Sequence, residues 1–251
     1  MRLVSGLLLS LMLVSAVFAE APVGYSEALS LYTKGKYEES LAKIRSIFDD
    51  NKTSLHLRLL AAANHMRAGR GNDGWAHLVY ATKDHPDQAG PMAFMAAYFR
   101  KQGQTGEATA WIGRAMAADP KNTQYKMEAA RIYYKAGQYA QARKFTDEVL
   151  SQSPGHQEAL ALDALIFLRQ GNPSDAVFRF RQALKQPATS KAALSNVYNN
   201  MGVALRKSAE VLDKSGSPGE AAARRTEAVE MFIKALELNP ENTFAKANKE
   251  S

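Results

Sequence analysis

The sequence contains no cysteine, which excludes disulfide bonds, cysteine-ligated zinc, iron–sulfur clusters and thiol catalysis. It also excludes a lipid anchor attached to a cysteine. Aromatic residues make up only 9% of the 251 residues, and no long apolar run follows the N-terminal segment, so a multi-span membrane protein is excluded as well. Glycine and proline are few, at 16 and 9 residues, but their positions turn out to be regular.

The first nineteen residues have the features of a secretory signal peptide. Arg2 gives the segment a positively charged start, and residues 3–14 are almost wholly apolar. Residues 17–19 then place small side chains at the two positions that a signal peptidase recognises, with Ala19 last before the cleavage site. An uncleaved anchor is the weaker alternative, because the apolar run of 17 residues is at the short limit for crossing a bilayer. We therefore expect an exported protein that begins near Glu20, periplasmic or alternatively secreted, without stable membrane insertion.

Three classes of residue recur with a period of 34. Five glycines carry the period most clearly: Gly35, Gly69, Gly103, Gly137 and Gly171. Two series of small residues share it: Ala28, Ala62, Ala96, Ala130 and Ala164, and Ser40, Gly74, Ala108, Ala142 and Ala176. Three prolines do so too: Pro86, Pro120 and Pro154. A common period and phase in independent residue classes predicts tandem repeats.

Each repeat is predicted to be a hairpin of two helices. Residues 123–135 and 140–151 carry apolar side chains at helical spacing and contain no proline. Gly137 lies between them, where a left-handed conformation can end the first helix without steric cost. Pro154 then ends the second helix, because it lacks an amide hydrogen. Such a hairpin cannot bury both apolar faces alone and must stack on its neighbours.

These repeats resemble the tetratricopeptide repeat (TPR) family, most closely from Ala93 to Pro120 and from Tyr125 to Pro154. The resemblance implies an all-α, right-handed superhelical solenoid of about six helix-turn-helix repeats over residues 20–251. We place the repeats at about 21–54, 55–88, 89–122, 123–156, 157–189 and 190–242, with 243–251 as a capping helix or tail.

Two repeats depart from the family pattern. The second has Gly71 and Gly74 where an aromatic residue and alanine are usual, so we expect its second helix to begin irregularly. The sixth contains an insertion near 206–220, with a loop at 214–219, and we expect longer helices on both sides of that loop.

No catalytic or metal-binding motif accompanies the repeats. The five histidines are scattered and none forms a close pair with a carboxylate in the sequence. There is no GxSxG or SxxK motif, and the glycine-rich segment 69–74 lies between two predicted helices and not after a strand. We therefore expect a non-enzymatic protein without cofactor or metal.

A row of cations is the best candidate for a binding surface. The residues two positions before the repeat glycines are Thr33, Arg67, Lys101, Lys135 and Arg169. Cations in the last turn of a helix are favoured by the helix dipole at roughly 0.3–1 kcal/mol each. Two explanations therefore stay open, a solvated helix-end pattern and a groove that selects an acidic segment or a C-terminal carboxylate.

The resemblance implies that the first helices of the repeats line a concave surface that holds a partner segment. We place eight residues there: Tyr32, Arg67, Arg100, Lys101, Arg131, Tyr134, Lys135 and Arg169. The expected function is a protein–protein interaction scaffold that assists assembly of an envelope complex for secretion, a pilus or the cell wall. Alternatives are an accessory subunit of a polysaccharide or peptidoglycan synthase and a periplasmic chaperone. Export and the absence of a basic cluster interleaved with aromatics argue against nucleic acid.

Overall fold

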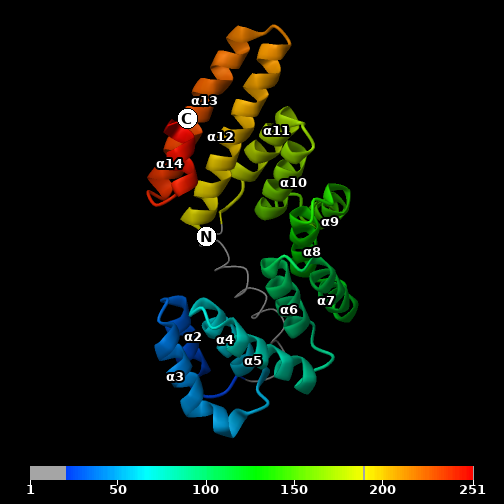
Figure 1. Cartoon of the computed structure of the whole chain (residues 1–251), viewed down its shortest axis with the longest axis vertical. Helices are drawn as coiled ribbons and strands as arrows, with labels where there is room; N and C mark the ends of the chain where they lie inside the picture. Colours follow the sequence, from blue (N-terminus) through cyan, green and yellow to red (C-terminus); the bar gives the residue numbers. More distant parts are fainter. Residues whose placement is uncertain (1–20, 189, 251) are drawn as a thin grey trace. The chain divides into compact units, whose positions relative to one another are not determined.

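The computed structural model describes residues 21–188 and 190–250, and all regular elements among them are helices (Figure 1). The predicted signal peptide at 1–19 lies outside the described residues. The chain divides into two compact units, one up to Glu128 and one from Ala129. Helix α8, Thr123–Lys135, contains the boundary between them. The predicted all-α repeat fold is confirmed within each unit.

The first unit consists of three helix hairpins followed by the start of α8. Its helices are α2 Tyr25–Thr33, α3 Tyr37–Phe48, α4 Leu55–Arg67, α5 Gly71–Asp84, α6 Ala89–Gln102 and α7 Thr105–Ala118, with a 3-10 turn at Asp49–Asn51 after α3. Helices α2 and α3, α4 and α5, and α6 and α7 pack as pairs, and α3 also packs on α4 and α5 on α6. Each pair therefore stacks on the next, as the repeat pattern predicts.

The second unit continues the pattern and ends in a longer hairpin. Its helices after α8 are α9 Tyr139–Gln152, α10 Gln157–Arg169, α11 Pro173–Leu184, α12 Lys191–Lys214, α13 Pro218–Leu238 and α14 Thr243–Glu250. Helices α10 and α11 form one pair and α12 and α13 another, the latter visible as the long orange hairpin in Figure 1. Helices α12 and α13 have 24 and 21 residues, because the sixth repeat is extended on both sides of its loop.

The repeat glycines end the first helix of each hairpin in the left-handed conformation. Their φ angles lie between 74° and 83°. In each turn the following amide donates to a carbonyl five residues earlier, as in Gln104 N–H to the Phe99 oxygen at 3.0 Å and Gln138 N–H to the Tyr133 oxygen at 2.9 Å. This is the bonding of a Schellman C-cap, which only glycine adopts without strain.

The small residues lie where the two helices of a hairpin approach most closely. Ala62, Ala96 and Ala130 are fully buried. Gly74 shows how tight the contact is, because a Cβ atom there would lie 2.9 Å from the backbone oxygen of Ala62. Helix α5 nevertheless begins regularly at Gly71, so the predicted irregular start is wrong. Gly74 permits the close approach of the two helices, and neither glycine disrupts the helix.

Helix α14 packs on the hairpin before it through buried polar contacts. The Asn242 amide donates to Ser195 Oγ at 2.9 Å, and the Ser195 hydroxyl donates to the Ala235 carbonyl at 2.7 Å. The Asn248 amide donates to Asn199 Oδ1 at 2.9 Å. These bonds satisfy polar groups that the end of the second unit would otherwise bury without partners. The segment after the sixth repeat is thus a helix held against α12 and α13.

Candidate partner-binding site

The predicted cations lie in the last turns of the first helices. Arg67 ends α4 and Lys101 lies in the last turn of α6, both in the first unit. Lys135 ends α8 and Arg169 ends α10, both in the second unit. The side chains of Lys101, Lys135 and Arg169 are exposed, whereas Arg67 is half-buried. Their positions satisfy the helix-dipole explanation and also leave these three charges accessible to a partner.

Arg100 and Arg131 have a different role from the exposed cations. Arg100 Nε lies 2.6 Å from Oε1 of Glu128, whose side chain is fully buried in α8. Arg131 of α8 forms an ion pair with Glu158 of α10, with 3.1 Å between Nε and Oε1. Each arginine thus joins its first helix to the first helix of the next repeat. The structure gives these two cations a packing role that neither sequence explanation included.

The two candidate tyrosines differ in accessibility. Tyr32 is buried and its ring lies 5.7 Å from that of Tyr37. Burial raises the pKa of the Tyr32 hydroxyl, and the positive charge of Arg67 opposes that rise. Tyr134 is half-buried, and its hydroxyl accepts a hydrogen bond of 3.2 Å from Nε of Arg169, which raises the pKa of that arginine. Tyr134 and Arg169 therefore form one polar element of the second unit, while Tyr32 belongs to the core.

A buried carboxylate in α10 was not predicted. Asp163 is fully buried, with its Oδ2 atom 2.8 Å from Nε of Arg179 and its Oδ1 atom 3.7 Å from Nε of Arg143. The guanidinium of Arg143 also lies over the ring of Phe167 at 4.4 Å. Burial raises the pKa of Asp163, although both arginines act to lower it. The three charged residues come from α9, α10 and α11 and hold these helices together. No local sequence pattern predicts this contact.

Two histidines that are apart in the sequence stack in the structure. The rings of His65 and His77 have centroids 5.4 Å apart and planes at 19°, and His65 Nδ1 lies 3.6 Å from Asp73. The fold thus brings together two histidines that are 12 residues apart, a contact that the spacing in the sequence did not predict. Arg70 Nε also donates to His65 Nδ1 at 3.1 Å. Among residues 21–188 and 190–250, however, no group of histidines and carboxylates is arranged to hold a metal ion.

The stacked histidines should make the first unit sensitive to acid. Burial, and the nearby charges of His65 and Arg58, lower the pKa of His77 to about 4. Since the unfolded chain takes up this proton near pH 6.5 and the folded chain near pH 4, stability should fall as the pH drops through that interval. Because His77 is only partly buried and solvent screens its charge interactions, the loss should be about 1–2 kcal/mol, less than the full shift in pKa would give. We expect His77→Phe, which keeps a ring but cannot titrate, to lose roughly that much less stability between pH 7 and pH 4 in urea denaturation. An unchanged pH dependence would refute this assignment.

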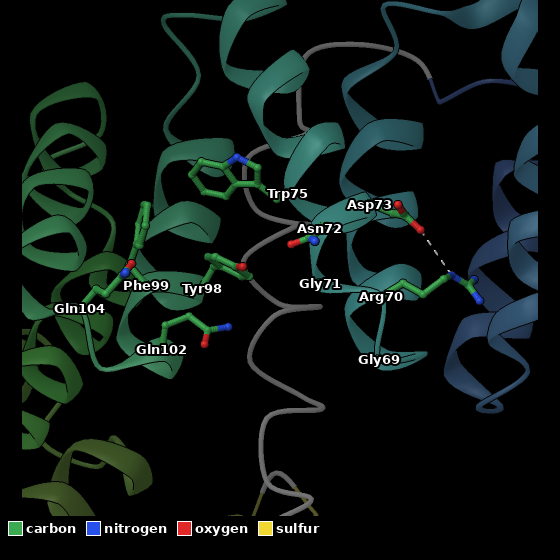
Figure 2. A pocket seen from close by; sticks show the side chains of 10 residues that line it. All are labelled: Gly69, Arg70, Gly71, Asn72, Asp73, Trp75, Tyr98, Phe99, Gln102 and Gln104. Carbon is green, nitrogen blue, oxygen red and sulfur yellow. Dashed lines mark ion pairs between the residues drawn. The ribbon is translucent and has the colours of Figure 1, made fainter.

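An open pocket of about 890 Å³ lies between the second and third repeats. We call it the junction pocket, and Figure 2 shows its lining: Gly69, Arg70, Gly71, Asn72, Asp73, Trp75, Tyr98, Phe99, Gln102 and Gln104. The three aromatic rings form one cluster, with the Trp75 ring centroid 5.4 Å from that of Tyr98 and 5.2 Å from that of Phe99. Segment 69–74, which the sequence does not support as a phosphate loop, instead lines this pocket, and no motif in the sequence predicts it.

Comparison with known proteins agrees with the repeat architecture. A family model described as tetratricopeptide repeat matches residues 99–166. A tetratricopeptide repeat protein from Parabacteroides merdae superposes with a TM-score of 0.67, covering 97% of this chain and 90% of its own at 12% identity. Residues 99–166 of this chain thus match the tetratricopeptide repeat family, and the repeat fold of the chain is that of TPR structures. The five left-handed glycines and the buried small residues are thus the signature positions of TPR hairpins.

Two further solved structures, PilW and PilF, share the fold. PilW, described as a widely conserved type IV pilus biogenesis factor, superposes with a TM-score of 0.68 at 14% identity, covering 90% of this chain and 96% of its own. PilF of Pseudomonas aeruginosa gives a TM-score of 0.65 at 10% identity, with 90% and 95% covered. At such identities the likeness establishes the fold alone.

One sequence relative is the human protein O-mannosyl-transferase TMTC1, 25% identical over 154 residues. The match covers 61% of this chain but only 16% of that protein. The match therefore concerns only a small part of a much longer relative. Within the part of the TPR chain that the structure describes, no helix combines the length and apolar character that crossing a bilayer requires.

Proposed function

We propose that this TPR protein is a non-catalytic interaction scaffold of the cell envelope that binds a segment of a partner protein along its first helices. The observation that carries the proposal is the recurrence of exposed cations at one repeat position, Lys101 in the first unit and Lys135 and Arg169 in the second. Arg67 occupies the same position in the second repeat. A segment rich in carboxylates, or a chain terminus with its carboxylate, has the matching charge.

Export and an assembly role are parts of the same proposal. The signal-like segment 1–19 supports passage into the envelope. The fold shared with PilF and PilW supports a role in building an envelope complex, with pilus biogenesis as the most direct example. The fold alone does not dictate function, so the proposal depends on the exposed cations and must be tested there.

Charge reversal tests the proposed surface. Lys101→Glu and Lys135→Glu, made singly, should each weaken binding of an acidic partner segment by roughly tenfold, because a favourable charge contact becomes repulsive. Each should lower the free energy of unfolding by only about 1 kcal/mol, because the side chains are exposed and the main loss is the favourable interaction with the helix dipole. The affinity is measured by titration with the partner's labelled segment at two salt concentrations, and the effect should shrink at higher salt.

Matched controls separate a local surface from a general charge effect. Lys144→Glu in α9 and Lys121→Glu before α8 change the net charge equally, and both side chains are exposed but lie outside the repeat position. Their affinities should stay within about twofold of the unmodified chain. If the four variants weaken binding equally, the positively charged protein attracts partners without a defined site and the proposal is wrong.

A further inference from the structure

We propose that the junction pocket binds an aromatic side chain, tyrosine in first place, from a segment of a partner protein. The pocket uses residues 69–75 and 98–104 of the first unit, and of the exposed cations only Lys101 lies within this stretch, outside the lining. The proposal therefore adds a second contact site to the interaction function. The two proposals can be tested separately: either the junction pocket or the cation surface could fail to bind its ligand without contradicting the other.

The first repeat shows what occupies the corresponding place. One period before Gly71 is Tyr37, whose ring packs on Tyr32 with centroids 5.7 Å apart. One period before Asn72 and Gln104 are Glu38 and Arg70. Arg70 donates two hydrogen bonds to the Glu38 carboxylate, at 2.6 and 3.1 Å. The ion pair thus bridges the first and second repeats, and beside it the Tyr37 ring packs on the preceding helix of its own repeat.

All three residues are replaced at the next junction. Glycine stands in place of the tyrosine at position 71, and two neutral amides, Asn72 and Gln104, stand in place of the ion pair. A Cβ atom at Gly71 would have the Tyr98 hydroxyl oxygen as its nearest neighbour, at 3.9 Å, which is ordinary van der Waals contact. The fourth repeat has a tyrosine at this position again, with the Tyr139 ring 5.8 Å from that of Tyr134. Tyrosine thus occupies this position in the first and fourth repeats, whereas the second repeat has no side chain there.

The pocket lining matches an uncharged ring with a polar tip. The half-buried Trp75, Tyr98 and Phe99 supply ring surfaces for edge or offset stacking, worth about 0.5–1.5 kcal/mol per pair. Three side-chain amides in the lining can donate to or accept from a phenol hydroxyl: Asn72, Gln102 and Gln104. The lining cation Arg70 already faces Glu38 and Asp73, at 2.6 and 3.7 Å, so the site favours a neutral ligand over an anion.

The test uses a neutral tyrosine probe and the two tryptophans of the chain. We label the indole N–H groups with ¹⁵N, assign Trp75 by Trp75→Phe, and titrate N-acetyl-L-tyrosinamide. The Trp75 signal should shift and saturate with a dissociation constant of roughly 1–10 mM, as expected for a fragment of a larger ligand. Trp111 lies in α7 outside the pocket lining and should not respond.

Two variants close the pocket in the ways that the chain itself uses elsewhere. Gly71→Tyr restores the ring of the first and fourth repeats, and Asn72→Glu with Gln104→Arg transfers the ion pair of the first junction. Each should weaken probe binding by roughly tenfold or more. Thr105→Tyr, the same change at the equivalent position of the third repeat, should leave the affinity within about twofold. Thermal unfolding checks that every variant remains folded.

The outcomes distinguish aromatic recognition from other ligands. No saturable shift at Trp75, or an equal shift at Trp111, would overturn the proposal. So would an equal response to N-acetyl-L-leucinamide, which lacks a ring, or to N-acetylglucosamine, which would assign the pocket to saccharides. Retained binding in both closed variants would also contradict it.

Discussion

Gly202→Ala is expected to lower the free energy of unfolding of the second unit by about 3 kcal/mol, at the upper end of overpacking effects. A Cβ atom at Gly202 in α12 would lie between 2.5 and 2.8 Å from three ring atoms of Phe232 in α13. Phe232 is fully buried in the core of the second unit, so its ring cannot move away into solvent. The two long helices would have to separate.

Gly113→Ala provides the matched control for this variant. Gly113 lies in the interior of α7, and no atom approaches its added Cβ within 4 Å. The same substitution should therefore stabilise the chain by about 0.5–1 kcal/mol through helix propensity. Urea denaturation followed by circular dichroism measures both. If Gly202→Ala were as harmless as Gly113→Ala, the close packing of α12 against α13 would be wrong.

Arg100→Met is expected to cost roughly 3 kcal/mol of folding stability, because it removes the cation that faces a buried carboxylate. Arg100 Nε lies 2.6 Å from Oε1 of Glu128, and the Glu128 side chain has no exposed surface. The loss should appear as a lower midpoint in denaturant and not as a selective loss of partner binding. This distinguishes Arg100 from the exposed cations, whose reversal should affect binding and lower stability by much less.

A double-mutant cycle isolates the contribution of this pair. Removing both charges, in Arg100→Met with Glu128→Leu, should recover much of the lost stability, since the buried Glu128 carboxylate is removed together with its cation. The control is Lys101→Met, a neighbouring exposed cation, which should change stability by less than about 0.5 kcal/mol. Simple additivity of the two single changes would show that Arg100 and Glu128 do not act together.

The fold was readable from the sequence because each TPR hairpin is defined by local rules. Gly137 requires a left-handed turn, Ala130 and Ala142 require close helix approach, and Pro154 follows a helix end. Such constraints act within one repeat and recur in the next. A local pattern that would be weak evidence in one repeat is therefore strong evidence when it recurs every 34 residues. The irregular start predicted at Gly71 was wrong because the glycine lies at the first position of α5, where little helical bonding is lost.

The candidate site was only partly readable, because its decisive contacts join different repeats. Lys101 and Lys135 were found from their periodic position, which is a local property. The partner of Arg100 is 28 residues away and that of Arg131 is 27 residues away, and nothing in the composition marks such pairs. The junction pocket also lies between two repeats. It is open where the second repeat has Gly71 at the position that Tyr37 occupies in the first. A period-by-period comparison of the sequence could have indicated it.

Site-specific photo-crosslinking in the native cell tests the account most directly. A photoreactive amino acid is placed at Lys101 and at Lys135, and separately at the control positions Lys121 and Lys144, and captured proteins are identified by mass spectrometry. We expect both first-helix positions to capture the same envelope protein, with about one captured molecule for each scaffold molecule in the crosslinked product. The control positions should give no such product. Capture of many unrelated proteins, equal capture at all four positions, or no capture at Lys101 and Lys135 would contradict a scaffold that binds a partner along its first helices.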